Sequence, residues 1–245
     1  MSSSRNASPT FSHRLARRAA LRRAAGCLAG CVLLTLTPGR SARAADHDDQ
    51  AWVNLSLITP LAPRSELKVD GFTQLTGTSS PARELVRIVA RTRLGDQMML
   101  GGGYVWTHVD SGGSDFTEHR AVEQLDFQQP LKWRGGAVTS RTQLEERYRG
   151  GQRGMSLRLR QLTRLDAPIG KAGVGVVLWN EYFHELRDTR WAGGAGPGLM
   201  LNFVGVHVPF ARGVAIEPGY LRQTTFQPGP NPEINAAAIW ITVRR

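Results

Sequence analysis

Long segments of alternating polar and apolar residues fill the chain from residue 46 onward, and they limit its fold more than any other feature. In Met155–Arg160, Met and Leu take one set of alternate positions, and Ser and Arg take the other. Successive side chains of a β-strand point to opposite faces, so each such segment predicts a two-faced strand. We find no comparable stretch of helical periodicity, and we therefore expect an all-β fold.

The expected strands are long for a soluble protein. Most have 11 to 14 residues, whereas a soluble strand usually has about five or six, and a tilted strand of about nine to eleven residues crosses a membrane. No run of 18 apolar residues follows residue 45, so membrane-spanning helices are not expected there. The expected strands are 52–58, 66–76, 83–93, 97–109, 117–129, 136–149, 154–166, 173–185, 198–208, 213–225 and 233–244.

The connectors between these strands alternate in character. One set is polar or rich in Gly and Pro, and the other set is mostly tight. Barrels of the outer membrane have this asymmetry, with longer loops outside and shorter turns in the periplasm. The polar set is 77–82, 110–116, 150–153, 186–197 and 226–232, and the tight set is 94–96, 130–135, 167–172 and 209–212.

This arrangement predicts an antiparallel transmembrane β-barrel of ten strands. If the polar connectors point outward, the strands from 66–76 to 233–244 close with both ends on the periplasmic side. The segment 52–58 would then be an eleventh strand in the lumen or the periplasm. Alternatively, one further strand has escaped notice and the barrel has twelve.

Alternation alone does not say which face of the strands is inside. A soluble barrel buries its apolar face, whereas a membrane barrel turns that face to lipid and keeps its charges in the lumen. Strand length, an export signal and aromatic residues near strand ends favour the membrane, and a secreted lipocalin-like or sandwich protein is the alternative. The aromatic residues expected in girdles are Trp52, Trp106, Trp133, Tyr148, Tyr182, Tyr220 and Trp240.

The first 44 residues have the composition of a secretory signal. They hold eight arginines and no acidic residue, and a 13-residue apolar stretch runs from Ala24 to Leu36. As a helix this stretch is too short for the roughly 30 Å hydrocarbon core of a bilayer. The small residues Ala42 and Ala44 predict cleavage after Ala44.

Cleavage there leaves residues 45–245 as one barrel domain in the outer membrane of a Gram-negative bacterium. Two other signals overlap the leader: a lipoprotein-like box that would place lipid on Cys31, and arginine pairs that suggest twin-arginine export or a later translation start. If cleavage follows Ala44, both cysteines are lost, and neither disulfides nor thiol chemistry is expected.

The net charge of +11 belongs mainly to this leader. The whole chain has 31 basic and 20 acidic residues, and removing the eight leader arginines leaves 23 against 20, about +3. That balance does not support a surface for nucleic acid. The expected partners are therefore outer-membrane lipid and at most a small polar solute, and we expect a monomer.

Five short motifs follow one another along the expected barrel. They are Glu118-His119-Arg120, Leu144–Arg149, Arg158-Leu159-Arg160, Glu181-Tyr182-Phe183 and Gly213–Gln223. Their order and spacing resemble a bacterial family of predicted outer-membrane barrels, domain-of-unknown-function family 2490. The resemblance runs from Trp52 to about Trp240, and the stretch Glu217–Gln223 carries it best. It implies the barrel fold and assigns no activity.

Two positions depart from that family's pattern. Family members tend to have an arginine after the asparagine matched by Asn202, and this chain has Phe203, so one inward cation is missing. Many outer-membrane barrels also end in an aromatic residue that assists assembly, whereas this chain ends in Arg244-Arg245.

Alternate positions of the expected strands carry carboxylates and guanidiniums that we expect to line the lumen. Arginine can bind a carboxylate through two hydrogen bonds, which favours cross-strand ion pairs. A salt-bridged lumen is the main interpretation, because a barrel of this size has little room for an open pore. A narrow path for small polar or anionic solutes is the alternative. The candidate lumen residues are Glu118, Arg120, Gln124, Arg141, Glu145, Arg147, Arg158, Arg160, Glu181, Glu217 and Gln223.

An outer-membrane lipid hydrolase or acyltransferase is a second alternative. His108 and Asp110 have same-face spacing, and Ser111 or Ser114 could supply a nucleophile, but no Gly-x-Ser-x-Gly elbow is present. Glu118 and His119 are adjacent in a strand, so their side chains cannot form a dyad. We find no motif for a metal, nucleotide or other cofactor, and none is expected.

Overall fold

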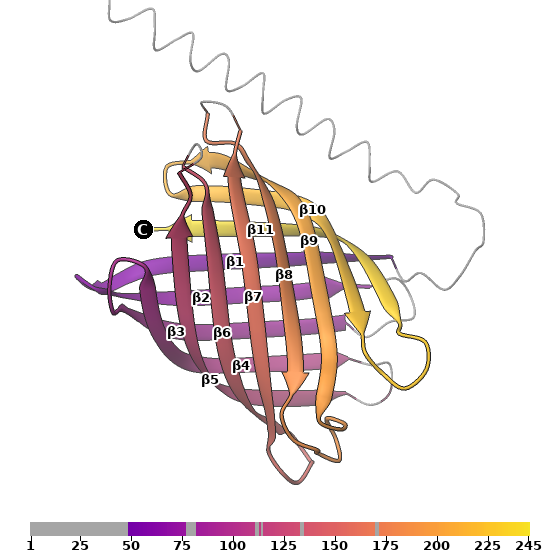
Figure 1. The fold of residues 1–245 in the computed structure, drawn as a ribbon. Coiled ribbons are helices and arrows are strands. Elements are labelled where there is room, and N and C mark those ends of the chain that lie inside the picture. The colour runs from indigo at the N-terminus through magenta and orange to yellow at the C-terminus, as the bar shows by residue number, and fades with distance from the viewer. Residues whose placement is uncertain (1–48, 77–81, 111–112, 114, 133–134, 170–171) are drawn as a thin grey trace, which may run out of the picture. The chain divides into compact units, whose positions relative to one another are not determined.

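The computed structural model describes residues 49–245 apart from 77–81, 111–112, 114, 133–134 and 170–171. Within these residues, eleven strands form one closed barrel, so the expected all-β fold is confirmed (Figure 1). No helix in the described part of the chain is long and apolar enough to cross a membrane. The predicted leader, its cleavage after Ala44 and the lipid site at Cys31 lie outside the described residues.

The strands follow one another around the wall in chain order. Ten neighbouring pairs are antiparallel, as expected for segments joined by short connectors. The strands are β1 (Asp49–Ala62), β2 (Ser65–Leu75), β3 (Ala82–Arg93), β4 (Met98–Asp110), β5 (Phe116–Pro130), β6 (Ala137–Arg149), β7 (Ser156–Pro168), β8 (Gly175–Glu185), β9 (Gly196–Ala211), β10 (Val214–Thr225) and β11 (Glu233–Arg244).

A parallel pairing of β1 with β11 closes the barrel, and this differs from the expected ten strands. The register runs from Asp49 opposite Asn235 to Ile58 opposite Arg244. The segment 52–58 is thus part of a 14-residue wall strand, not a strand inside the lumen or the periplasm. The count of ten strands was wrong because it assumed that the first and last strands of the barrel must pair antiparallel.

Parallel closure also separates the two ends of the described chain. β1 starts at the mouth that carries the longer connectors, and β11 ends at the mouth that carries the tight turns. The start of β2 and the end of β11 lie at one mouth, as expected for the ten strands, but β1 as a further wall strand places the first described residues at the other mouth. We call these the long-loop end and the tight-turn end of the barrel.

The two faces of the wall differ in the way that a membrane barrel requires. Charged side chains such as Asp70, Glu118 and Glu145 are at most 2% exposed, although all lie in strands. Large apolar side chains on the alternate positions point outward, and Leu55 is 51% exposed. A soluble barrel would have the opposite arrangement, so the fold is a transmembrane β-barrel.

The predicted aromatic girdle residues divide between the two faces. Trp106, Tyr148, Tyr182 and Tyr220 occupy outward positions in the half of the barrel toward the long-loop end. Trp52 and Trp240 instead point inward and belong to an apolar cluster, which corrects their expected place in a girdle. Trp133 lies outside the described residues.

That apolar cluster fills one side of the lumen, along β8 to β11 and β1 to β2. Phe203 stacks on Trp179 at 5.1 Å between ring centroids, so an aromatic ring stands where the resembling family tends to have a cation. Its ring passes over Gly205 and Gly219, where a Cβ would come within 2.4 Å of it. Only glycine leaves room for this ring in the lumen.

Candidate functional site

The other side of the lumen is charged, and Glu145 on β6 is its most enclosed member. Glu145 is 0% exposed. Its carboxylate accepts hydrogen bonds from Gln143 Nε2 at 2.7 Å, from Arg158 Nε at 2.8 Å and from an Arg160 Nη at 2.7 Å. A buried charge is tolerated when it is paired and hydrogen-bonded in this way.

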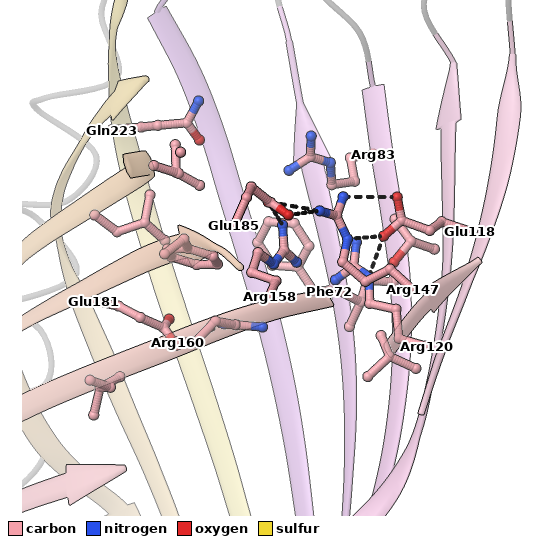
Figure 2. A pocket seen from close by; sticks show the side chains of 18 of the residues that line it. Phe72, Arg83, Glu118, Arg120, Arg147, Arg158, Arg160, Glu181, Glu185 and Gln223 are labelled. Carbon is pink, nitrogen blue, oxygen red and sulfur yellow. Dashed lines mark hydrogen bonds and ion pairs between the residues drawn. The ribbon is translucent and has the colours of Figure 1, made fainter. Parts of the chain in front are cut away.

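A second chain of ion pairs lies nearer the long-loop end. Arg147 donates two hydrogen bonds to Glu118, at 2.9 and 3.1 Å, and two to Glu185, at 2.8 and 3.0 Å (Figure 2). Arg120 also binds Glu118, and Ser156 donates to Glu185 at 3.1 Å. One guanidinium thus links β5, β6 and β8 across the inside of the wall.

Further pairs continue this network toward the tight-turn end. Glu181 on β8 accepts hydrogen bonds from Arg141 at 2.7 Å and from Arg160 at 3.0 Å. Arg164 on β7 binds both oxygens of Glu217 on β10, at 2.9 and 2.7 Å. His207 Nδ1 lies 2.8 Å from the same carboxylate.

Charged lumen residues on β2, β3 and β5 were not among the sequence candidates. Asp70 is 1% exposed and pairs with Arg87 at 2.7 Å and with Lys68 at 3.2 Å. Arg91 pairs with Glu66, and Arg91 also lies 3.6 Å from Asp126. These residues share the strand parity of neighbouring inward positions, and that parity is the signal that could have found them.

A cavity of about 1070 Å³ occupies the lumen between the charged and the apolar sides. Its wall includes residues 192–195 and 226–228 of the connectors at the long-loop end, and residues 196–198 at the start of β9. Eleven basic and five acidic side chains line it among the described residues, so its wall carries an excess of positive charge. Figure 2 shows part of this wall, with Arg147 between Glu118 and Glu185.

All eleven sequence candidates occupy inward positions of their strands. Glu118, Arg120, Arg141, Arg147, Arg158, Arg160, Glu181 and Gln223 line the cavity. Gln124, Glu145 and Glu217 are buried in the wall beside it. Gln124 does not join the ion pairs directly, and its amide donates to Asp126 at 2.6 Å.

The residues of the hydrolase alternative lie elsewhere. His108 and Asp110 occupy outward positions on β4, and His108 stacks on Trp106 at 6.2 Å between ring centroids. Ser111 and Ser114 lie outside the described residues. Glu118 points into the lumen, whereas His119 is exposed on the outer face and bonds Tyr104. Within the described ranges, no group of three His, Cys, Asp or Glu side chains could hold a metal ion.

Comparisons with known proteins found a relative, a solved structure and a family model, and the family model agrees with the resemblance. An uncharacterized protein of Methylorubrum extorquens is 29% identical over 209 residues, which cover 80% of this chain and 87% of the relative. The solved structure of LpxR from Salmonella typhimurium matches with a TM-score of 0.48 and 11% identity, over 73% of this chain and 83% of that one. A family model with the description "Protein of unknown function (DUF2490)" matches residues 49–233. That match spans more than half of the sequence, and the chain belongs to the DUF2490 family.

Proposed function

We propose that this protein is an outer-membrane barrel whose lumen is a blind cavity, closed toward the tight-turn end by ion pairs and reached from the long-loop end. It acts in the membrane without serving as an open diffusion pore. The apolar outer face, the buried charges and the asymmetry of the connectors support the location. A cleaved leader ending at Ala44 and a monomeric state belong to the same proposal.

Ion pairs between strands that are not neighbours in the wall carry the proposal of a closed lumen. The pair between Arg164 and Glu217 joins β7 to β10, so it bridges the interior above β8 and β9. Arg141 and Glu181 likewise join β6 to β8. Paired side chains of this kind fill the narrow interior of a small barrel.

The rival is a narrow anion-selective pore, which the positive excess of the cavity wall favours. The closed lumen and the pore predict different ion conductances for the protein. We expect the folded protein in a planar bilayer to show no conductance above background. A double change, Arg164→Ser with Glu217→Ser, removes the bridge and should introduce ion conduction.

The matched control removes an ion pair from the outer face. Arg222 and Glu233 pair on exposed positions of β10 and β11, so Arg222→Ser with Glu233→Ser should leave conductance at background. Steady anion-selective conductance of the unaltered protein would overturn the closed lumen. Recovery of the protein from the periplasm without detergent would overturn the location.

A further inference from the structure

The wall of the lumen cavity brings incompletely paired cations and aromatic rings together at the long-loop end. Arg83 near the start of β3 lines the cavity. None of the carboxylates in the described ranges forms an ion pair with it, and its buried Nε has no hydrogen-bond partner there. Figure 2 shows Arg83 beside the Arg147 network but outside its dashed lines.

The surroundings of Arg83 are rich in positive charge. Arg120, Arg147 and Arg149 repel its guanidinium, and Glu118 attracts it. Arg120 and Arg147 already bind Glu118, so this carboxylate is shared among several cations. A cluster of like charges inside a barrel is costly unless an anion joins it.

Arg149, near the end of β6, is a second incompletely paired cation. Its guanidinium stacks on Phe116 at 3.8 Å from the ring centroid and comes no closer than 3.9 Å to Glu118. Its Nε is buried without a hydrogen-bond partner in the described part of the chain. Arg83 and Arg149 thus keep donor capacity for a ligand with oxygen acceptors.

Apolar side chains of β1, β2, β8 and β9 line the same cavity. Trp52 on β1 packs edge-on against Phe72 on β2, with ring centroids 5.3 Å apart. Phe183 and Leu201 extend this surface along β8 and β9. In the strand register, Arg83 stands opposite Gln74, and Gln74 stands opposite Trp52, so the cation and the ring are two strands apart at one level.

We propose that the cavity binds an amphipathic anion, with its sulfate-, phosphate- or carboxylate-type head on Arg83 and Arg149 and its apolar body against Trp52, Phe72 and Phe183. The volume of about 1070 Å³ is large enough for a small organic ligand. This inference goes beyond a closed lumen and does not depend on it, because binding and conductance are measured separately.

Calorimetric titration of the folded full chain in a neutral detergent tests the proposal. The probes are octyl sulfate, inorganic sulfate and octanol, which present the whole ligand, the head alone and the body alone. We expect one octyl sulfate per protein, bound at least about tenfold more tightly than either half.

The variants separate the site from partition into the micelle. Arg83→Gln with Arg149→Gln should weaken octyl sulfate binding by about tenfold or more, since charged hydrogen bonds are lost. Arg222→Gln, on the outer face, should bind like the unaltered protein. Heat-dependent migration in gel electrophoresis verifies that each variant is folded.

Three results would overturn the proposal. Equal octyl sulfate binding by the unaltered protein and the double variant would mean partition into the detergent alone. Sulfate binding as tight as octyl sulfate would mean a plain anion site. Octanol binding as tight as that of octyl sulfate would mean an apolar cavity in which the arginines take no part.

Discussion

Replacing Glu145 by glutamine should test whether the lumen network stabilises the barrel. The change keeps the shape of the side chain but removes a charge that is 0% exposed and accepts hydrogen bonds from two arginines and one glutamine. Arg160 keeps a second carboxylate, Glu181, at 2.8 Å. Among the carboxylates of the described residues, Arg158 keeps only Glu185, at 3.8 Å, so one guanidinium loses its close partner.

Removing one partner of a buried ion pair costs about 3 to 5 kcal/mol, and the surviving contact of Arg160 favours the lower value. We therefore expect Glu145→Gln to lower the free energy of unfolding by about 3 kcal/mol. Urea unfolding in lipid vesicles, followed by tryptophan fluorescence, measures it. Adding Arg158→Gln should restore part of the loss, because the stranded cation is removed as well.

An exposed turn charge provides the control. Asp96→Asn lies in the connector between β3 and β4 and should change the free energy of unfolding by less than about 0.5 kcal/mol. Equal losses for Glu145→Gln and Asp96→Asn would refute the reasoning. So would a double variant, Glu145→Gln with Arg158→Gln, that is no more stable than Glu145→Gln alone.

Two further changes test the wall itself. Gly103→Ala should destabilise the pairing of β3 and β4, because a Cβ there would lie 2.1 Å from a β3 carbonyl oxygen, whereas Gly102→Ala has 3.7 Å of room. Urea unfolding should separate these two variants clearly, and matching curves would contradict the close packing. Leu55→Lys places a charge mid-strand on the outer face and should cost about 2 to 4 kcal/mol in vesicles, against about 0 to 1 for Leu61→Lys near the strand end. Equal costs at both positions would argue against a lipid-facing wall.

Strand positions and faces could be predicted because both are local properties of the sequence. Period-two alternation in β6 separates Glu145 and Arg147 from Leu144 and Tyr148, and the structure has the same division between lumen and outer face. The strand bounds expected from the sequence mostly agree with those of the structure within a few residues. The membrane-type orientation needed more than alternation, since apolar and charged faces alternate equally well in a soluble barrel.

Closure and the cavity could not be predicted, because both depend on residues far apart in the chain. The parallel pairing of β1 with β11 joins the two ends of the barrel sequence, and no local pattern encodes it. Arg83 has the same strand parity as Arg87, yet in the folded barrel Arg87 pairs with Asp70, whereas Arg83 forms no ion pair with a carboxylate of the described residues. The inward turn of Trp52 and Trp240 likewise follows from the seam that β1 and β11 form.

The parallel pairing of β1 with β11 also places the two ends of the barrel sequence at opposite mouths, whereas an even-stranded barrel has both ends at one mouth. An odd number of crossings means that a tag fused before β1 and a tag fused after β11 would emerge on opposite sides of the bilayer. Parallel ladders are slightly less stable per residue than antiparallel ones. We therefore expect β1 and β11 to be the first strands to separate under mechanical force. Their pairing should also be the last to form when the barrel assembles.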